Sequence, residues 1–277
     1  MSPNMPGDLK LRIHLSEGSL ELCITAKKID KVFPHEEVVP AHLDRLKLAL
    51  LSSPLQRNPI IIDSASGLIL DGTHRWAAMH DLGYRWIVVC EVDYNNPLIV
   101  LDRWVRAYKH IKSSLVEEIA REFEAEPVER NKVENEDLIL GTSSTLYRVN
   151  YTSVEEAFTK LHAIEKKLLR LYGYTPSYIA SGYRGKVEEY SFFLVPPLLS
   201  KNDVVKLARK GFSLPPKSTR HLVPARPLSV NVPLKLLIDE SLDFEALGEI
   251  LRQRNPVLLK PPIRLDRDYQ ELVLYFI

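Results

Sequence analysis

The chain has 277 residues, of which 45% are hydrophobic and 26% charged, and its formal net charge is +1. This is the composition of a soluble globular protein with one large or two small domains, and the charge balance gives no strongly basic face for nucleic acid. No apolar run approaches the ~20 residues of a membrane span, and the N-terminus carries no apolar signal core. We therefore expect a cytoplasmic protein that binds neither membrane nor nucleic acid.

Strands and helices are predicted to alternate through about residue 94, which indicates an α/β fold. Pro40 suits the first position of a helix, and Gly83 suits the end of another. The expected strands are 20–26, 59–63, 68–70 and 85–94, and the expected helices are 40–51 and 73–83.

The remainder is predicted to be a second, α+β lobe. A mobile surface loop is expected over 124–137, because this charged stretch has few apolar residues, and a proline-rich loop over 212–227. Helices are expected at 98–111, 153–172, 200–211 and 244–254, and strands at 187–197 and 271–277.

The stretch "SGLILDGTHRWAAMHDLGYRW" places Asp71 and Gly72 between an apolar run and a helix that starts with Thr73, His74 and Arg75. Cations in the first turn oppose the helix dipole at roughly 0.3–1 kcal/mol each, unless an anion lies there. The free N–H groups of a helix start bind phosphate, which would turn this cost into attraction. A surface turn with Thr73 as N-cap and Arg75 solvated is the alternative. A carboxylate such as Asp71 beside a phosphate needs a metal ion or a proton-handling role.

Two further loops carry groups suited to chemistry. In "FPHEEVVP", Glu36 and Glu37 follow His35 between prolines, which suits a positioned base, although an exposed acidic pair can simply be solvated. In "LPPKSTRHLVP", consecutive donors could grip a carboxylate or phosphate, or form a basic surface loop. These donors are Lys217, Ser218, Thr219, Arg220 and His221.

The segments "PHEE", "LDGTHRWAAMHDLG" and "ARKGFSLPPKSTRHLVPARP" together resemble the free L-serine kinases of the ParB/sulfiredoxin-like superfamily. The resemblance extends over about residues 25 to 238, with a poorly matched middle. It implies a nucleotide- and phosphate-binding ParB/sulfiredoxin-like lobe over 1–105, an α+β substrate lobe over 106–277 with a donor loop at 212–224, and an active site in the cleft between them.

The implied reaction transfers a phosphoryl group from ADP, or possibly from ATP, to the serine hydroxyl and yields O-phospho-L-serine for serine and cysteine metabolism. By resemblance Glu36 is the general base, and Asp71 binds Mg²⁺ or supports the base. Gly72, Thr73, His74 and Arg75 handle the nucleotide phosphates. Thr219, Arg220 and His221 contact the serine carboxylate or the product phosphate, and Trp104 matches a pocket tryptophan less closely; by pattern alone it would be a core residue of an amphipathic helix.

The sequence departs from the family at Thr73, where serine kinases carry histidine, and in a C-terminal extension after about residue 240. A sulfiredoxin-type reductase needs a cysteine at position 73 and is therefore excluded. A ParB-like nucleotide-binding regulator or DNA-binding protein is the alternative, although no arginine-rich phosphate motif or helix-turn-helix is evident. The choice of donor and the oligomeric state stay open.

Overall fold

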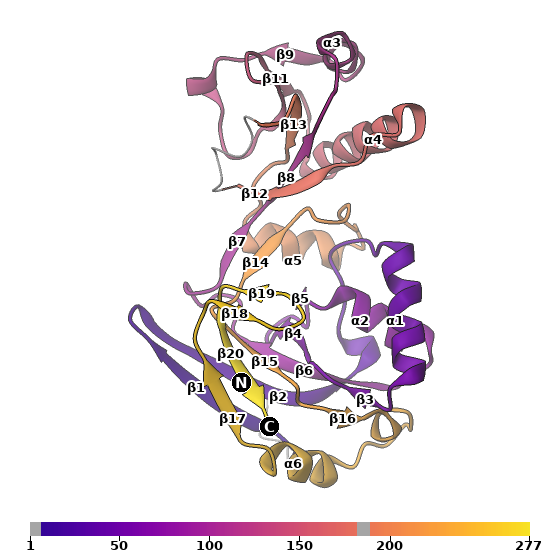
Figure 1. Cartoon of the computed structure of the whole chain (residues 1–277), viewed down its shortest axis with the longest axis vertical. Coiled ribbons are helices and arrows are strands. Elements are labelled where there is room, and N and C mark those ends of the chain that lie inside the picture. The colour runs from indigo at the N-terminus through magenta and orange to yellow at the C-terminus, as the bar shows by residue number, and fades with distance from the viewer. Residues whose placement is uncertain (1–6, 182–188) are drawn as a thin grey trace. The chain divides into compact units, whose positions relative to one another are not determined.

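The structure is a computed structural model that describes residues 7–181 and 189–277. It divides into two compact units (Figure 1): unit 1 comprises Met1–Val100 and His221–Ile277, and unit 2 comprises Leu101–Arg220. The chain passes between the units within two short strands, β7 (Val100–Asp102) and β14 (Arg220–Leu222).

This division differs from the expected lobes of 1–105 and 106–277. The first boundary lies close to the expected one, but the last 57 residues of the chain return to unit 1 (221 to 277). The return depends on a pairing between distant segments, in which β16 (Val232–Pro233) pairs with β3 (Leu55–Gln56). Local sequence patterns do not reveal such a pairing.

The main sheet of unit 1 has five strands in the order β1-β2-β6-β4-β5. Only β4 and β6 run parallel; the other neighbours are antiparallel. The central strands β4 and β6 are almost wholly buried, which explains their apolar sequences, whereas β2 is buried at about half of its residues. The strands are β1 (Leu9–Leu15), β2 (Gly18–Lys28), β4 (Ile60–Asp63), β5 (Ile69–Asp71) and β6 (Trp86–Val92).

Helices α1 (Pro40–Ser52) and α2 (Thr73–Asp81) lie beside each other next to this sheet (Figure 1). Pro40 is the first residue of α1, as predicted. Gly83 follows the end of α2 in the left-handed region at a φ of 80°, which is the role predicted for it. The positions of both helices and of the 68–71 strand are therefore close to those read from the sequence.

The C-terminal part of unit 1 forms a second, three-stranded sheet in the order β15-β20-β17. Leu228, Tyr269 and Val273 form a buried cluster in it. Its elements are β15 (Ala225–Leu228), α6 (Phe244–Arg252), β17 (Pro256–Leu259), β20 (Leu272–Phe276) and a hairpin of β18 (Ile263–Arg264) and β19 (Asp268–Tyr269). Of these, α6 and β20 are predicted elements, whereas β17 and the hairpin are not.

Unit 2 has a six-stranded sheet in the order β12-β8-β13-β10-β11-β9. Helix α5 begins with a complete capping box between Ser200 and Asp203. The elements are β8 (Trp104–Tyr108), α3 (Ser113–Glu122), β9 (Ala125–Pro127), β10 (Leu138–Gly141), β11 (Leu146–Val149), α4 (Val154–Tyr172), β12 (Ser177–Ala180), β13 (Phe192–Val195) and α5 (Lys201–Arg209).

The predicted helix 98–111 is wrong, because its residues form the strands β7 and β8. Strand β8 pairs with β12 on one side and β13 on the other, and most of it is buried. A strand covered on both faces lacks the alternating pattern that separates strands from helices. Trp104 is therefore a strand residue.

Three other expectations need adjustment. The predicted loop 124–137 contains β9 and a 3-10 turn at Arg130–Lys132, and the predicted proline-rich loop 212–227 contains β14 and part of β15. The first two residues of the predicted strand 187–197 lie outside the described residues. No helix within 7–181 and 189–277 has the length and apolar character needed to cross a bilayer.

Candidate functional site

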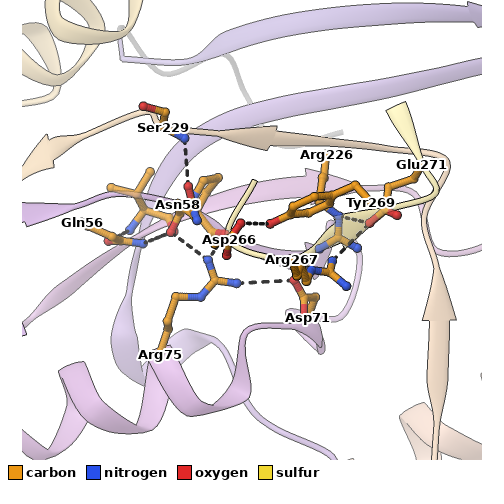
Figure 2. A network of polar contacts seen from close by, with 12 residues as sticks. Gln56, Asn58, Asp71, Arg75, Arg226, Ser229, Asp266, Arg267, Tyr269 and Glu271 are labelled. Atoms are coloured by element: carbon orange, nitrogen blue, oxygen red, sulfur yellow. Dashed lines mark hydrogen bonds and ion pairs between the residues drawn. The ribbon is translucent and has the colours of Figure 1, made fainter. Parts of the chain in front are cut away.

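The junction between β5 and α2 forms one side of a pocket of about 370 Å³ in unit 1. This volume falls in the range of small-molecule sites, roughly 300–1,000 Å³. The predicted phosphate-binding residues at the start of α2 all line it, together with residues of the C-terminal part of unit 1. The polar lining includes Asp71, Thr73, His74, Arg75, Arg226, Asp266, Arg267 and Tyr269, beside Gly72. Figure 2 shows Asp71 and Arg75 near Arg226, Asp266, Arg267 and Tyr269.

Gly72 is the N-cap residue of α2 and has a φ of 101°, in the left-handed region. A Cβ atom there would lie 2.6 Å from Cγ2 of Ile60, so both the conformation and the close approach require glycine. Thr73 is the first helical residue and not the N-cap, which corrects one of the sequence interpretations. Gly72 has no side chain that could cap the helix, so α2 begins without a side-chain cap, and a helix start of this kind can bind an anionic ligand.

The Arg75 guanidinium is held by backbone carbonyls and by one carboxylate. Its Nη1 donates to the carbonyl oxygens of Asn58 at 3.1 Å and Pro59 at 3.0 Å, and its Nη2 lies 3.4 Å from Oδ2 of Asp71. Arg226 donates from Nη1 to the same carboxylate oxygen at 2.8 Å. Burial raises the pKa of Asp71, but Arg226 and Arg75 outweigh this effect and lower the pKa to about 2.

His74 explains part of the unfavourable placement of two cation-forming side chains in the first turn of α2. Its Nε2 accepts a hydrogen bond from the backbone N–H of Val39 at 2.9 Å. A ring nitrogen that accepts carries no proton, so His74 is neutral while this bond is made. Arg75 is then the cation of the first turn, and Asp71 offsets its charge.

The opposite side of the pocket comes from β15 and the β18–β19 hairpin (Figure 2). The Tyr269 ring is buried, and its hydroxyl donates to Asp266 at 2.8 Å. The guanidinium carbon of Arg267 lies 4.3 Å from the centre of this ring. Glu271 forms ion pairs with Arg267 at 3.2 Å and Arg226 at 2.5 Å. A network of ion pairs therefore joins this side of the pocket to Asp71.

Asp71 does not form a metal site by itself. Its carboxylate is bound by two guanidinium groups, and among the described residues no three His, Cys, Asp or Glu side chains gather where they could hold an ion. Mg²⁺ is commonly held by one or two carboxylates together with substrate phosphates. The residues present thus fit a cation only when anionic oxygens of a ligand accompany it.

The predicted base, Glu36, lies beside a buried histidine of the same loop. Nδ1 of His35 is 2.9 Å from the carbonyl oxygen of Ile69, which can only accept, so Nδ1 carries the proton. Burial lowers the pKa of His35, which favours the neutral ring. Its Nε2 is then an acceptor, at 3.7 Å from Oε1 of Glu36. Glu36 is largely shielded from solvent, whereas Glu37 is exposed.

His221 belongs to the same group of side chains in unit 1. The His221 and His35 rings meet edge to face with their centres 5.1 Å apart. The Tyr94 hydroxyl lies within hydrogen-bond distance, 2.7 Å, of Nε2 of His221. Burial raises the pKa of Tyr94, so the phenol keeps its proton. The structure therefore brings Glu36 and His221, which are far apart in sequence, to one place through His35.

Trp104 and Arg220, two of the other predicted site residues, form a cluster in unit 2. The Arg220 guanidinium carbon and the Lys217 ammonium lie 5.1 Å and 5.6 Å from the centre of the Trp104 ring. Arg220 also pairs with Asp102 at 3.3 Å. Thr219 is buried. The cluster joins an aromatic face with two cations, which suits a small anionic or zwitterionic ligand.

Several residues of these sites escape prediction from sequence. Arg226 lies within the motif "ARKGFSLPPKSTRHLVPARP" but received no role, because nothing local shows that it reaches Asp71. Tyr94 is the last residue of the predicted strand 85–94, and no local pattern shows that it reaches His221. Arg267, Tyr269 and Glu271 belong to the unassigned extension, and only the charged and aromatic "RLDRDYQE" could have drawn attention to them.

Comparison with known proteins identifies relatives over most of the chain. An ATP-dependent L-serine kinase of Staphylothermus marinus is 31% identical over 228 residues, which are 76% of this chain and 89% of the relative. The ADP-dependent L-serine kinase SerK of Thermococcus kodakarensis is 26% identical over 234 residues, 77% of this chain and 96% of the relative.

The fold also matches solved structures. A free serine kinase in complex with ADP superposes with a TM-score of 0.66 at 22% identity, covering 77% of this chain and 93% of that chain. No family model matches the chain. The fold predicted from the three motifs is thus confirmed, and about a quarter of the chain lies outside the superposed part.

Proposed function

The chain belongs to the L-serine kinase family, and we propose on this premise that it transfers the terminal phosphoryl group of an adenine nucleotide to the hydroxyl of free L-serine. The products are O-phospho-L-serine and the nucleotide with one phosphate fewer. The single observation that carries this proposal is the polar pocket at the uncapped start of α2. Family membership favours this activity over that of a ParB-like regulator.

The phosphates of the donor are proposed to occupy the pocket beside Gly72. The N–H groups of Thr73, His74 and Arg75 supply donors, and the guanidinium groups of the lining supply positive charge. Phosphoryl transfer requires positioning and charge neutralisation, with little covalent work for the protein. Asp71 is proposed to act through Arg75 and Arg226, whose side chains it fixes.

A Mg²⁺ ion bound together with the nucleotide would supply positive charge to the phosphate oxygens. Asp71 and Asp266 are the carboxylates that line the pocket and could reach such an ion. The remaining charge on the phosphates would be met by the arginines and by the helix start.

Glu36 is proposed to be the general base. The serine hydroxyl gives its proton to the Glu36 carboxylate while its oxygen bonds to the terminal phosphorus, and the bond from that phosphorus to the departing nucleotide oxygen breaks. Nε2 of neutral His35 faces the carboxylate and can accept a hydrogen bond from Glu36 only once Glu36 is protonated. His35 thereby favours the protonated state that Glu36 reaches in the reaction.

The amino acid is proposed to bind through the residues carried over from the family. Arg220 beside Trp104, together with Thr219, would hold the serine carboxylate, and His221 would contact the carboxylate or the product phosphate. The bidentate fork of arginine suits a carboxylate. Asp102 holds Arg220 in place.

Incubation with L-serine, MgCl₂ and either ATP or ADP tests the proposal. Mass spectrometry should detect O-phospho-L-serine in step with ADP or AMP, and D-serine serves as the control acceptor. A failure to form the product with either donor would overturn the proposed function. The same experiment decides the donor, for which both nucleotides stay candidates.

A further inference from the structure

The C-terminal extension contributes an arginine to the proposed nucleotide pocket. The β18–β19 hairpin lies after residue 240, beyond the part of the sequence that resembles the family, yet Asp266, Arg267 and Tyr269 line the pocket with the start of α2. Figure 2 shows Arg267 next to Asp71 and Arg226. The extension is thus part of the site.

Three arginines line the pocket, and they differ in how firmly they are held. The Arg226 side chain is only 10% exposed and is bound by Asp71 and Glu271. Arg75 is 25% exposed and is bound by two carbonyls and Asp71. Arg267 is 53% exposed, and within the part of the chain that the structure describes it forms an ion pair with Glu271 alone. Arg267 can therefore turn toward an anion with the smallest loss of existing contacts.

The environment of Arg267 suits an anion-binding role. Its guanidinium stacks on the buried Tyr269 ring, whose hydroxyl is anchored to Asp266. Stacking covers one face of the guanidinium plane and leaves its N–H groups directed outward along the edges. A phosphate could take the place of the Glu271 carboxylate at this edge, since both accept from the same fork.

We propose that Arg267 binds the outer phosphates of the nucleotide, so that the C-terminal extension completes the donor site. This inference rests on the proposed function only for the identity of the ligand. It assigns to the extension a binding role that the family motifs, which end before it, do not supply.

Nucleotide binding by the full chain, measured by titration calorimetry with ATP, ADP and AMP, tests the inference without requiring catalysis. Arg267→Ala should weaken ATP and ADP about tenfold, as expected for loss of a charge-assisted hydrogen bond, and leave AMP unchanged. Arg267→Lys keeps the charge but not the fork and should give an intermediate loss. Arg264→Ala, on the same hairpin but outside the pocket lining, is the matched control.

Equal weakening of ATP, ADP and AMP, or no weakening at all, would overturn the inference. A thermal midpoint for Arg267→Ala close to that of the wild type and of Arg264→Ala would separate loss of a contact from loss of folding. If the wild type forms no O-phospho-L-serine but binds ATP in an Arg267-dependent way, the proposed function fails and the inference stands. If the wild type forms O-phospho-L-serine but Arg267→Ala leaves its nucleotide affinity unchanged, the inference alone fails.

Discussion

The two sides of the unit 1 pocket are built in different ways. The side formed by α2 is fixed by the backbone: Gly72 adopts a left-handed conformation, and the Arg75 side chain is tied to the carbonyls of Asn58 and Pro59. The side formed by the C-terminal hairpin is fixed by side chains, through the stacking of Arg267 on Tyr269 and the ion pairs of Glu271.

The α2 side therefore supplies fixed geometry, whereas the hairpin side supplies charges whose ionic partners can change. Backbone groups at a helix start keep their direction whether or not a ligand is present, so the α2 side is pre-organised for phosphate. The ion pair of the half-exposed Arg267 with Glu271 is screened by salt and can exchange one anionic partner for another. We therefore expect changes near α2 to abolish function or folding, and changes in the hairpin to tune affinity.

The largest effect is expected from Glu36→Gln, in the loop that His35 holds against Ile69 of β5. Loss of the general base should lower kcat about 10²–10⁴-fold while nucleotide affinity stays unchanged. Formation of O-phospho-L-serine, followed by mass spectrometry, measures it. Glu37→Gln changes the exposed neighbouring carboxylate and should retain activity. Full activity in Glu36→Gln would remove Glu36 from the mechanism.

The next effect is expected from Gly72→Ala. Left-handed strain together with the overlap with Ile60 should lower the free energy of unfolding by about 2–5 kcal/mol, measured by urea denaturation. Gly83→Ala is the matched control, because Gly83 has a similar positive φ but no atom within 4 Å of the added Cβ. It should cost about 1 kcal/mol from strain alone. Equal costs at the two positions would contradict the close-packed α2 junction.

A smaller, pH-dependent effect on stability is expected from Asp71, which pairs with Arg75 and Arg226. The pKa of Asp71 is about 2 in the folded protein, below its ordinary value of 3.8, so its ionised form stabilises the fold above about pH 4. This contribution is lost as the pH falls from about 4 towards 2. At neutral pH, Asp71→Asn should cost on the order of 1 kcal/mol, since the carboxylate is partly exposed. Urea denaturation should show that the difference in the free energy of unfolding between the wild type and Asp71→Asn shrinks as the pH falls from about 4 towards 2. A difference that does not change with pH would contradict the ion-pair assignment.

The smallest effect is expected from Glu271→Gln on the hairpin side. Removing this carboxylate releases Arg226 and Arg267 from a competing anion, so the affinity for ATP should rise by about two- to fivefold, equivalent to about 0.5–1 kcal/mol. Titration calorimetry measures the change. Asp268→Asn, which neutralises an acid of the same hairpin outside the pocket lining, should leave the affinity unchanged. Weaker binding in Glu271→Gln would mean that Glu271 positions the arginines for the ligand.

The α2 side could be predicted from the sequence because its signals are local. The Asp-Gly step, the helix start and the histidine-glutamate loop each occupy a few consecutive residues, so their chemistry is visible before folding. The partners of His74 show the limit of this approach. Its acceptor role toward Val39, 35 residues away, depends on the packing of α1 against α2.

The hairpin side could not be predicted, because its roles arise from contacts between distant segments. Arg226 and Asp71 are 155 positions apart, and the return of the C-terminal segment to unit 1 depends on strand pairings such as that of β16 with β3. The same limit explains the misassigned strand β8, because its two neighbours in the sheet, β12 and β13, come from later sequence.

A crystal structure of the Glu36→Gln variant with ATP, MgCl₂ and L-serine tests the central claim most directly. We predict that the phosphates contact the N–H groups of Thr73, His74 and Arg75, with the outer phosphate within hydrogen-bond distance of Arg267. A nucleotide bound elsewhere, with the start of α2 in contact only with solvent, would contradict the assignment of this pocket as the donor site.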